Sequence, residues 1–425
     1  MTITQQASAL AAKQAAQTIA YPDAHKDNAT YIRYLTIKDI EGPRDDVASV
    51  LDQITSGIPR KKSQDQKKIR DAARMVLANL VHCIYQRKWL ALPTKPEMYN
   101  KGEYLHDQLY LSHRPTMAVL EHLRDVGWLL PAVSGNNLQH TSTMHCPTPE
   151  LENENEIFQW LYLVSKPFTE EYIFASHRED ASCSKQKVYL GLRASSHDLQ
   201  NMKAINNHLR EQSYALHGPQ QLIYLDEPDL PVMGGRVYMD LQRLPDKRAK
   251  VRLNTLINGQ PVVEIDLKAN HLRMAAALFK EKLPTDPYEE IVKVTGYRRD
   301  VVKSAINRSL GSDHAGRVLH GARYDEDMPI DNDTFKAITT ETKRIYPFVP
   351  FNEGIGVMLQ SLEGQIMINA QLRLIELGIT ALPIHDALMV NRGLMIQASA
   401  EQALKECWAE QLGVNFHPAV ETDSI

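Results

Sequence analysis

Val262-Val263-Glu264-Ile265-Asp266 is an apolar run that ends in an aspartate, and Leu382-Pro383-Ile384-His385-Asp386 is a second run of the same kind. Each pattern predicts a buried strand that carries one aspartate to its end. The segment between them contains a helical pattern with Arg299 and Lys303 on one side. Two strand-end carboxylates and a cationic helix can together hold two divalent metal ions and a triphosphate. The sequence therefore predicts a phosphoryl-transfer site.

The composition is that of an ordinary soluble, globular chain. Its 425 residues, 43% apolar and 24% charged, suffice for two or three domains with their own cores. The formal net charge of −4 gives no sign of a nucleic-acid binder. A nucleic-acid surface would therefore have to be a local basic patch.

Cysteine usage and hydropathy predict a cytoplasmic protein. The four cysteines are scattered and form no C-x-x-C pair, so neither a disulfide framework nor a zinc ribbon is expected. The N-terminus lacks the basic and apolar segments of a secretory signal. No apolar run approaches the ~20 residues that span a bilayer, so no membrane partner is expected.

The chain divides by composition into four regions. We expect a flexible tail over residues 1–30, because this stretch is rich in Ala, Gln, Thr and Ser and carries little core material. Residues 31–150 are predicted to be a mainly helical nucleic-acid-binding region, with a basic run at residues 60–62. Residues 151–229 are expected to connect it to a last region, residues 230–425. Within the connection, residues 201–217 show a helical pattern.

Residues 110–143 predict a winged helix. Ser112-His113-Arg114-Pro115 is typical of a helix start, and Gly127 is placed to end that helix. The following stretch, residues 128–133, is strand-like and leads into a turn and a second, polar strand. Such modules commonly place a helix and a wing on DNA. Any small α+β packing unit would show the same pattern, so a winged helix and a plain α+β unit both remain open.

Four motifs follow one another in the last region. The first is a glycine turn and a basic residue, Gly234-Gly235-Arg236, followed by a basic stretch up to Arg252. Next come Asp266 and Arg273, spaced as D-x-x-x-x-x-x-R, and then Arg299 and Lys303, spaced as R-x-x-x-K. The fourth is the pair His385-Asp386 between two apolar strands. In this order, the motifs resemble the palm and fingers of family A DNA polymerases and of the single-subunit RNA polymerases of phages and mitochondria.

The resemblance implies a role for each motif residue. Asp266 and Asp386 would be the metal ligands and, with Lys303, the catalytic residues, binding two Mg²⁺ ions, with Mn²⁺ as an alternative. The residues implied to contact the incoming nucleotide are Arg299, Lys303, His271 and Asn307. The residues implied to contact nucleic acid are Arg236, Arg273, Gln360 and His385.

The sequence departs from both groups of relatives at three positions. His271 stands where DNA polymerases of this family carry a glutamate that screens out ribose and RNA polymerases keep a small residue. Ala387 follows Asp386, where the DNA polymerases usually have glutamate and the RNA polymerases often serine. Asn307 and Gly311 occupy positions where the relatives place an aromatic residue. These departures leave the choice between deoxyribonucleotides and ribonucleotides open, although the bulk of an imidazole favours deoxyribonucleotides.

The resemblance implies an α+β fold: a right-hand polymerase with an antiparallel palm sheet and helical fingers over residues 230–425. Residues 151–229 would then be connecting or thumb-like. We expect a compact DNA-directed DNA polymerase of a phage, plasmid or other mobile element that extends a 3′-hydroxyl on a DNA primer-template. Its expected partners are nucleoside triphosphates, the DNA template and other replication proteins. One alternative is a single-subunit RNA polymerase or primase. Another is a winged-helix replication protein that has lost catalysis.

Overall fold

The computed structural model describes residues 29–31, 36–37, 45–58, 63–93, 96–99, 105–106, 109–110, 112–134, 142–148, 151, 164–166, 168–177, 186–226, 233–244, 250–311 and 329–424. The predicted tail (except its last two residues), the basic run at residues 60–62 and part of the basic stretch before Arg252 lie outside these ranges. The chain forms two compact units. One comprises residues 1–168, 212–219 and 243–261, and the other residues 169–211, 220–242 and 262–425.

The first unit is built on a long buried helix. Helix α3 (Ser63–Gln86) contributes a nearly continuous apolar core between Ala72 and Tyr85, against which α2 (Asp45–Gly57) and α5 (His113–Asp125) pack. A four-stranded sheet has the order β1-β3-β7-β6. Its strands are β1 (Ala29–Tyr31), β3 (Trp89–Pro93), β6 (Val133–Ser134) and β7 (Ser142–His145). The smaller elements of this unit are α4 (Pro96–Tyr99), β2 (Thr36–Ile37), β4 (Leu105–His106), β5 (Leu109–Tyr110), β8 (Val164–Ser165) and β13 (Leu256–Ile257).

The helix and hairpin predicted after residue 112 are present. Helix α5 begins at His113, and Gly127 follows its end with a φ of +80°. Strands β6 and β7 then pair antiparallel. The predicted strand over residues 128–133 is much shorter than expected, because only Leu129 forms a bridge, to Pro147, before β6 begins. Whether the arrangement contacts DNA as a winged helix stays a prediction.

The second unit contains a mixed four-stranded sheet of order β10-β9-β11-β12. The strands are β9 (Ile173–His177), β10 (Gln186–Tyr189), β11 (Gln221–Asp226) and β12 (Met233–Tyr238). Strands β9 and β11 run parallel, and the other pairs are antiparallel. Helix α7 (Ser196–Arg210) packs against β9. It starts earlier than the helix predicted over residues 201–217, because Ser195 caps its start by accepting a hydrogen bond from the Asp198 backbone N–H. It also ends earlier, at Arg210.

Gly234 and Gly235 do not form the predicted turn but lie inside β12, where the register with β11 shifts. Both have φ values near +90° to +99°, a backbone conformation that favours glycine. Helix α13 (Gly356–Glu376) approaches β12 closely at this point. A Cβ on Gly364 would overlap the carbonyl oxygen of Gly235. Two glycines therefore permit this helix and strand to meet backbone to backbone.

The predicted strands around the two aspartates form a second, antiparallel sheet. Strand β14 (Gln260–Leu267) pairs with β16 (Ala387–Asn391) on one side and β17 (Val420–Asp423) on the other. Strand β15 (Ala381–Ile384) pairs with β16 through the hairpin that carries His385 and Asp386. The first two residues of β14, Gln260 and Pro261, belong to the first unit, where they pair with β13. The strand at residues 262–266 and the hairpin are thus confirmed.

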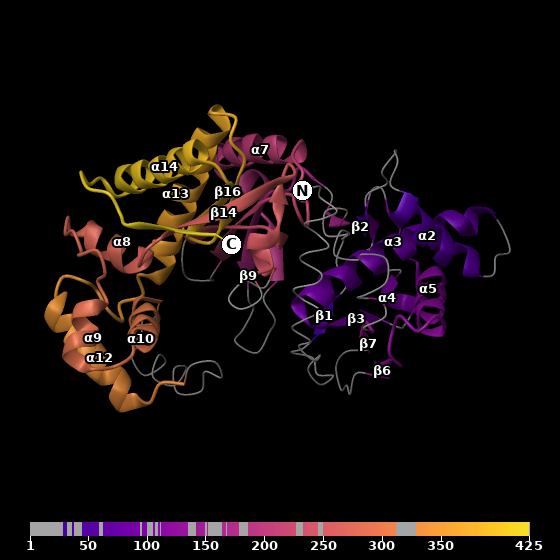
Figure 1. Ribbon diagram of the computed structural model, residues 1–425, viewed down its shortest axis with the longest axis horizontal. Helices are drawn as coiled ribbons and strands as arrows, with labels where there is room; N and C mark the ends of the chain where they lie inside the picture. The colour runs from indigo at the N-terminus through magenta and orange to yellow at the C-terminus, as the bar shows by residue number, and fades with distance from the viewer. Residues whose placement is uncertain are drawn as a thin grey trace. The chain divides into compact units, whose positions relative to one another are not determined.

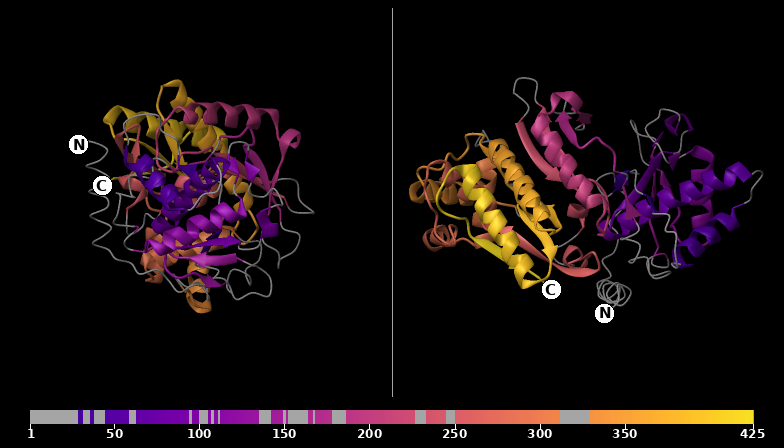
Figure 2. Two further views of the ribbon diagram at one scale, coloured as in Figure 1. Left: turned by 90° about the vertical axis from the view of Figure 1, so that its right-hand side faces the viewer. Right: turned by 90° about the horizontal axis from the view of Figure 1, so that it is seen from above.

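Helices surround this sheet and build the main core of the second unit. Helix α13 lies beside α14 (Leu394–Leu412) on one side and α7 on the other (Figures 1 and 2). Helix α8 (Asn270–Leu278) follows β14 directly. Helices α9 (Glu289–Thr295), α10 (Arg299–Gly311) and α12 (Asn332–Ile345) pack together beyond it (Figure 1). The second unit is therefore a mixed α/β fold, and α10 confirms the helix predicted to carry Arg299 and Lys303. Within the described residues, none of the helices is long and apolar enough to span a membrane.

Candidate active site

Strand pairing brings Asp266 and Asp386 together at one end of the antiparallel sheet. Asp266 is the Cα partner of Ala387, the residue that follows Asp386. Beyond this pair, the backbone N–H of Leu267 donates a hydrogen bond to the carbonyl oxygen of Asp386, at 3.2 Å. The two aspartates are 120 residues apart in the sequence and converge because β14 and β16 are neighbours.

The two carboxylates repel each other in a poorly solvated place. Burial, followed by the charge of Asp386, raises the pKa of Asp266 to about 7, although the positive charge of Lys303 acts in the opposite direction. Burial and the charge of Glu363 raise the pKa of Asp386 to about 6. The Oδ1 atom of Asp266 is buried and has no hydrogen-bond partner among the described residues. Such a pair is stabilised as carboxylates only if positive charge comes close.

Glu363 of α13 was not predicted, and it organises the surroundings of these aspartates. Its side chain is 1% exposed, and Oε1 accepts a hydrogen bond from Nε of Arg236 at 2.8 Å. Its Oε2 atom lies 3.0 Å from Nε2 of His271 and accepts from Nδ2 of Asn270 at 3.2 Å. Burial alone would raise the pKa of Glu363, but the hydrogen bonds and charges of His271 and Arg236 lower it overall. The carboxylate is therefore held ionised.

This network joins four elements close to Asp386. Arg236 comes from β12, Asn270 and His271 open α8, and Glu363 lies on α13. Nε1 of Trp408, on α14, donates to Oδ1 of Asn270 at 3.2 Å. In the sequence, Glu363 is marked only as a lone acidic residue on an otherwise apolar face of α13. Its partners lie far away in the chain, so the sequence does not reveal the network.

Arg273 is buried, and its predicted contact with nucleic acid stays a prediction. The residue is 6% exposed. Its guanidinium donates to the carbonyl oxygens of four residues: Lys268 at 2.8 Å, Leu283 at 3.3 Å, Pro284 at 2.8 Å and Thr285 at 2.8 Å. Such use of the donors favours a structural role, in which Arg273 fixes the loop after α8.

Helix α10 presents its cationic side chains to solvent. Lys303 is exposed, yet close enough to Asp266 for its charge to lower the pKa of that carboxyl. Nε of Arg299 donates to Oδ2 of Asp286 at 2.8 Å, and its guanidinium lies 5.3 Å from the centre of the Tyr288 ring. Asn307, one turn after Lys303, is exposed as well. Three of the four side chains predicted to contact a nucleotide thus share one helix, and Lys303 is the one whose charge acts on Asp266.

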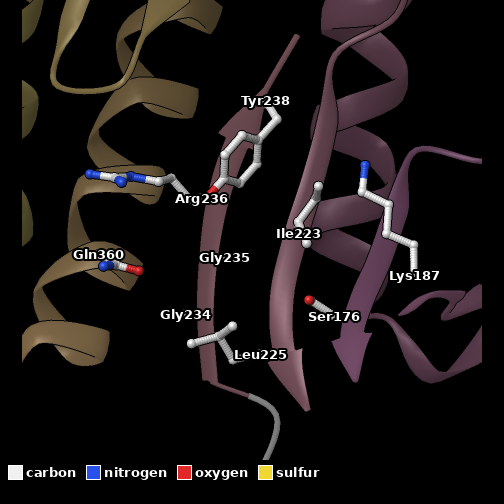
Figure 3. Close-up of a pocket in the computed structure, with 9 residues that line it drawn as sticks. All are labelled: Ser176, Lys187, Ile223, Leu225, Gly234, Gly235, Arg236, Tyr238 and Gln360. Carbon is white, nitrogen blue, oxygen red and sulfur yellow. The ribbon is translucent and has the colours of Figure 1, made fainter. Parts of the chain in front are cut away.

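The remaining predicted residues lie at the borders of the site. His385 is exposed at the tip of the hairpin, with a φ of +56°. Gln360 is half-buried on α13 and lines a cavity with Arg236, Gly234 and Gly235 (Figure 3). His271 lies against Glu363, as described above.

Strand β17 adds a carboxylate that the sequence did not reveal. Glu421 is the Cα partner of Asp266 on the side opposite Ala387, and directly paired residues project on the same face of a sheet. The charge of Glu421 contributes to the raised pKa of Asp266. Nζ of Lys268 lies 3.1 Å from its Oε2 atom. No motif marked this residue, because it depends on the pairing of a strand near the C-terminal end.

The donor set at the sheet end fits divalent cations of the Mg²⁺ type. Two neighbouring carboxylates, one with an unpartnered buried oxygen, offer hard oxygen ligands. The described residues contain no cluster of three or more His, Cys, Asp or Glu side chains arranged for a metal. Mg²⁺ commonly binds through one or two carboxylates and completes its shell with water and substrate phosphates. The pair therefore suits an ion that is shared with a phosphate substrate.

Comparisons with known proteins give a match of low similarity among solved structures. No family model and no curated protein matches the chain. Among solved structures, it is similar to the POL domain of Pol1 from M. smegmatis, a structure in complex with DNA primer-template and dNTP. The identity is 13%, the TM-score is 0.28, and the match covers 88% of this chain and 65% of that chain. At this similarity, the roles of individual residues rest on their own geometry.

Proposed function

We propose that the chain is a template-directed nucleotidyltransferase, and specifically a compact DNA polymerase that extends a 3′-hydroxyl. One observation carries the proposal: Asp266 and Asp386 meet at one end of an antiparallel sheet, with the charge of Lys303 acting on Asp266. Paired carboxylates beside a cationic helix suit phosphoryl transfer, in which positioning and charge neutralisation supply most of the rate.

Asp266 and Asp386 would hold the Mg²⁺ ions. When bound, such ions lower the pKa of an attacking hydroxyl and neutralise charge on phosphate oxygens. Lys303 is exposed and close to Asp266, so it would bind the triphosphate and donate a proton to the departing pyrophosphate. Arg299 shares its helix and would assist, after exchanging its contact with Asp286 for a phosphate.

His271 supports deoxyribonucleotides as substrates. The residue opens α8, five positions after Asp266, and Glu363 holds its imidazole at 3.0 Å. A fixed, bulky ring beside the metal-binding residues would limit the space around a nucleotide sugar. The alternative of an RNA polymerase or primase is supported by Ala387, whose small side chain lies opposite Asp266.

A primer-extension assay with the full chain tests the proposal and separates these products. We expect Mg²⁺-dependent extension of a DNA primer on a DNA template with dNTPs. Extension with NTPs alone, or synthesis without a primer, would instead identify an RNA polymerase or primase. Asp333→Asn, at an exposed position at the start of α12, is a matched control for substitutions at the two site aspartates. No incorporation with either nucleotide type under any primer condition would contradict the proposal.

A further inference from the structure

Over strands β9 and β11, the four-stranded sheet of the second unit has one covered face and one open face. Strand β10 is exposed on both faces, because Val188, the partner of Ala175, is 40% exposed. Residues of the covered face are buried, including Ile173, Ala175 and Leu222. On this side, the Tyr224 hydroxyl donates to Oδ2 of Asp198 on α7 at 2.7 Å. Residues that alternate with these, such as Phe174 and Ser176, are half-buried, and Lys187 and Tyr189 on β10 are exposed. The open face is therefore the face of β9 that carries Phe174 and Ser176, together with Lys187 and Tyr189 of β10.

Strand register arranges the side chains of the open face in rows. Tyr189 pairs with Phe174, Phe174 with Ile223, and Ile223 with Arg236. Paired residues share a face, so one row crosses all four strands from Tyr189 to Arg236. In the next row, Lys187 pairs with Ser176, and Ser176 with Leu225. Aromatic and cationic residues thus stand side by side on one surface.

The contacts within these rows form an aromatic and basic platform. The rings of Phe174 and Tyr189 lie 5.8 Å apart, and Nζ of Lys187 lies 5.5 Å from the centre of the Phe174 ring. Beside them is a cavity of about 190 Å³, whose lining residues include no acidic side chain. Figure 3 shows Lys187 and Arg236 on opposite sides of Ile223, with Gln360 on the helix beside Arg236. Gly234 and Gly235 line the same cavity.

We propose that this open face binds a single nucleic-acid strand, with bases against Phe174 and Tyr189 and phosphates near Lys187 and Arg236. Grooves that hold unpaired strands combine positive charge with aromatic side chains on which bases stack. A duplex keeps its base faces stacked internally and offers nothing to exposed rings. The pairing of aromatic and cationic residues therefore favours an unpaired strand over a duplex.

The face leads toward the two aspartates, and this step rests on the proposed function. Arg236 ends the aromatic row and contacts Glu363, which in turn lies 3.0 Å from His271. The charge of Glu363 acts on Asp386. A single strand that lies along the row would thus lead toward the aspartates as the template strand, which pairs with the primer whose 3′-hydroxyl is extended there.

Binding of the full chain to a fluorescent oligodeoxythymidine, followed by anisotropy, tests the inference. The variants are Tyr189→Leu, Phe174→Leu and Lys187→Gln, each checked for unchanged thermal unfolding. Phe279→Leu is the matched control, because Phe279 is 52% exposed after α8 and lies off this sheet. We expect each aromatic variant to weaken binding about tenfold, in line with stacking worth ~1–3 kcal/mol per base. Lys187→Gln should make the plot of log affinity against log salt concentration less steep, by the amount that corresponds to about one lost phosphate contact. Phe279→Leu should bind as the wild type does.

Crosslinking locates the strand directly. An oligonucleotide with 5-bromodeoxyuridine should crosslink to peptides from β9 or β10. Wild-type affinity in all three sheet variants, or tighter binding of a blunt duplex than of the single strand, would overturn the inference. If the chain incorporates no nucleotide but binds a single strand in a Tyr189-dependent way, the proposed function is rejected and this binding site is retained. If the chain incorporates nucleotides and all three sheet variants bind the single strand normally, the proposed function is retained and this binding site is rejected.

Discussion

Nε2 of His271 lies 3.0 Å from Oε2 of Glu363, whose side chain is 1% exposed. The same carboxylate accepts a hydrogen bond from Arg236. Glu363→Gln should therefore leave a partly buried guanidinium without its counter-charge. We expect a loss of about 3 kcal/mol in the free energy of unfolding, the range for breaking buried ion pairs, measured by urea denaturation. Asp333→Asn is the exposed control, and a loss below about 1 kcal/mol in Glu363→Gln would show that the network contributes little.

Removing the charge of Asp266 should stabilise the protein above neutral pH. Its folded pKa is raised to about 7 by burial and Asp386. A carboxyl with a raised folded pKa stabilises the fold below its unfolded pKa of roughly 4, and this stability is lost as the pH rises through the folded pKa. Asp266→Asn lacks this dependence. The stability of Asp266→Asn relative to the wild type should therefore increase from about pH 4 to pH 7 and then level off.

Thermal unfolding across this pH range measures the effect. A constant difference between Asp266→Asn and the wild type at every pH would contradict the proposed repulsion between the aspartates.

Mg²⁺ should stabilise the wild type by binding the folded state alone. Above pH 7, both carboxylates are ionised and repel each other, so a cation between them relieves the repulsion. We expect millimolar Mg²⁺ to raise the unfolding temperature of the wild type, and chelation to reverse it. The shift should be absent in Asp266→Asn and Asp386→Asn and present in Asp333→Asn. Equal shifts in all four proteins would place the ion elsewhere.

Arg273 is predicted to act on stability rather than on nucleic-acid affinity. Arg273→Met would leave four backbone carbonyls without their donor, at a cost on the order of 1–3 kcal/mol for buried groups left unsatisfied. Urea denaturation should report this loss. At temperatures where the variant remains folded, its affinity for primer-template should match that of the wild type. A large loss of affinity in a stably folded variant would restore the predicted nucleic-acid contact.

Gly364 is expected to tolerate no side chain. A Cβ there would overlap the carbonyl oxygen of Gly235, so Gly364→Ala must separate α13 from β12. Overpacking of this kind costs about 1–3 kcal/mol or more. Gly311→Ala is the matched control, since a Cβ on Gly311 meets open space. Equal unfolding free energies of the two variants would show that α13 and β12 are not in close contact.

The sequence predicted the elements whose patterns are local. The apolar run before Asp266, the hairpin around Asp386 and the helix that starts at Arg299 appear where the patterns placed them. A glycine pair commonly signals a turn, so the sequence predicted a turn at Gly234 and Gly235. In the structure they lie in a strand, and Gly235 is in close backbone contact with Gly364 of another element.

The parts of the site that were missed depend on pairing between distant segments. Glu363 and Glu421 carry no motif, and their place near the aspartates follows from α13 and β17. Arg273 has the spacing of a functional arginine, but the carbonyls that it binds could not be known before the fold of residues 283–285. Sequence patterns thus indicated the aspartates but not the network that supports them.

Single-turnover nucleotide incorporation in Mg²⁺ tests the central claim most directly, with the wild type, Asp266→Asn, Asp386→Asn and Asp333→Asn compared on one primer-template. The account predicts that each site variant loses incorporation by a factor of at least about 10³, as expected when a metal ligand of a phosphoryl-transfer site is removed. Binding of the primer-template should stay within about threefold of the wild type, and Asp333→Asn should be fully active. Incorporation by both Asp266→Asn and Asp386→Asn at the wild-type rate would contradict the account.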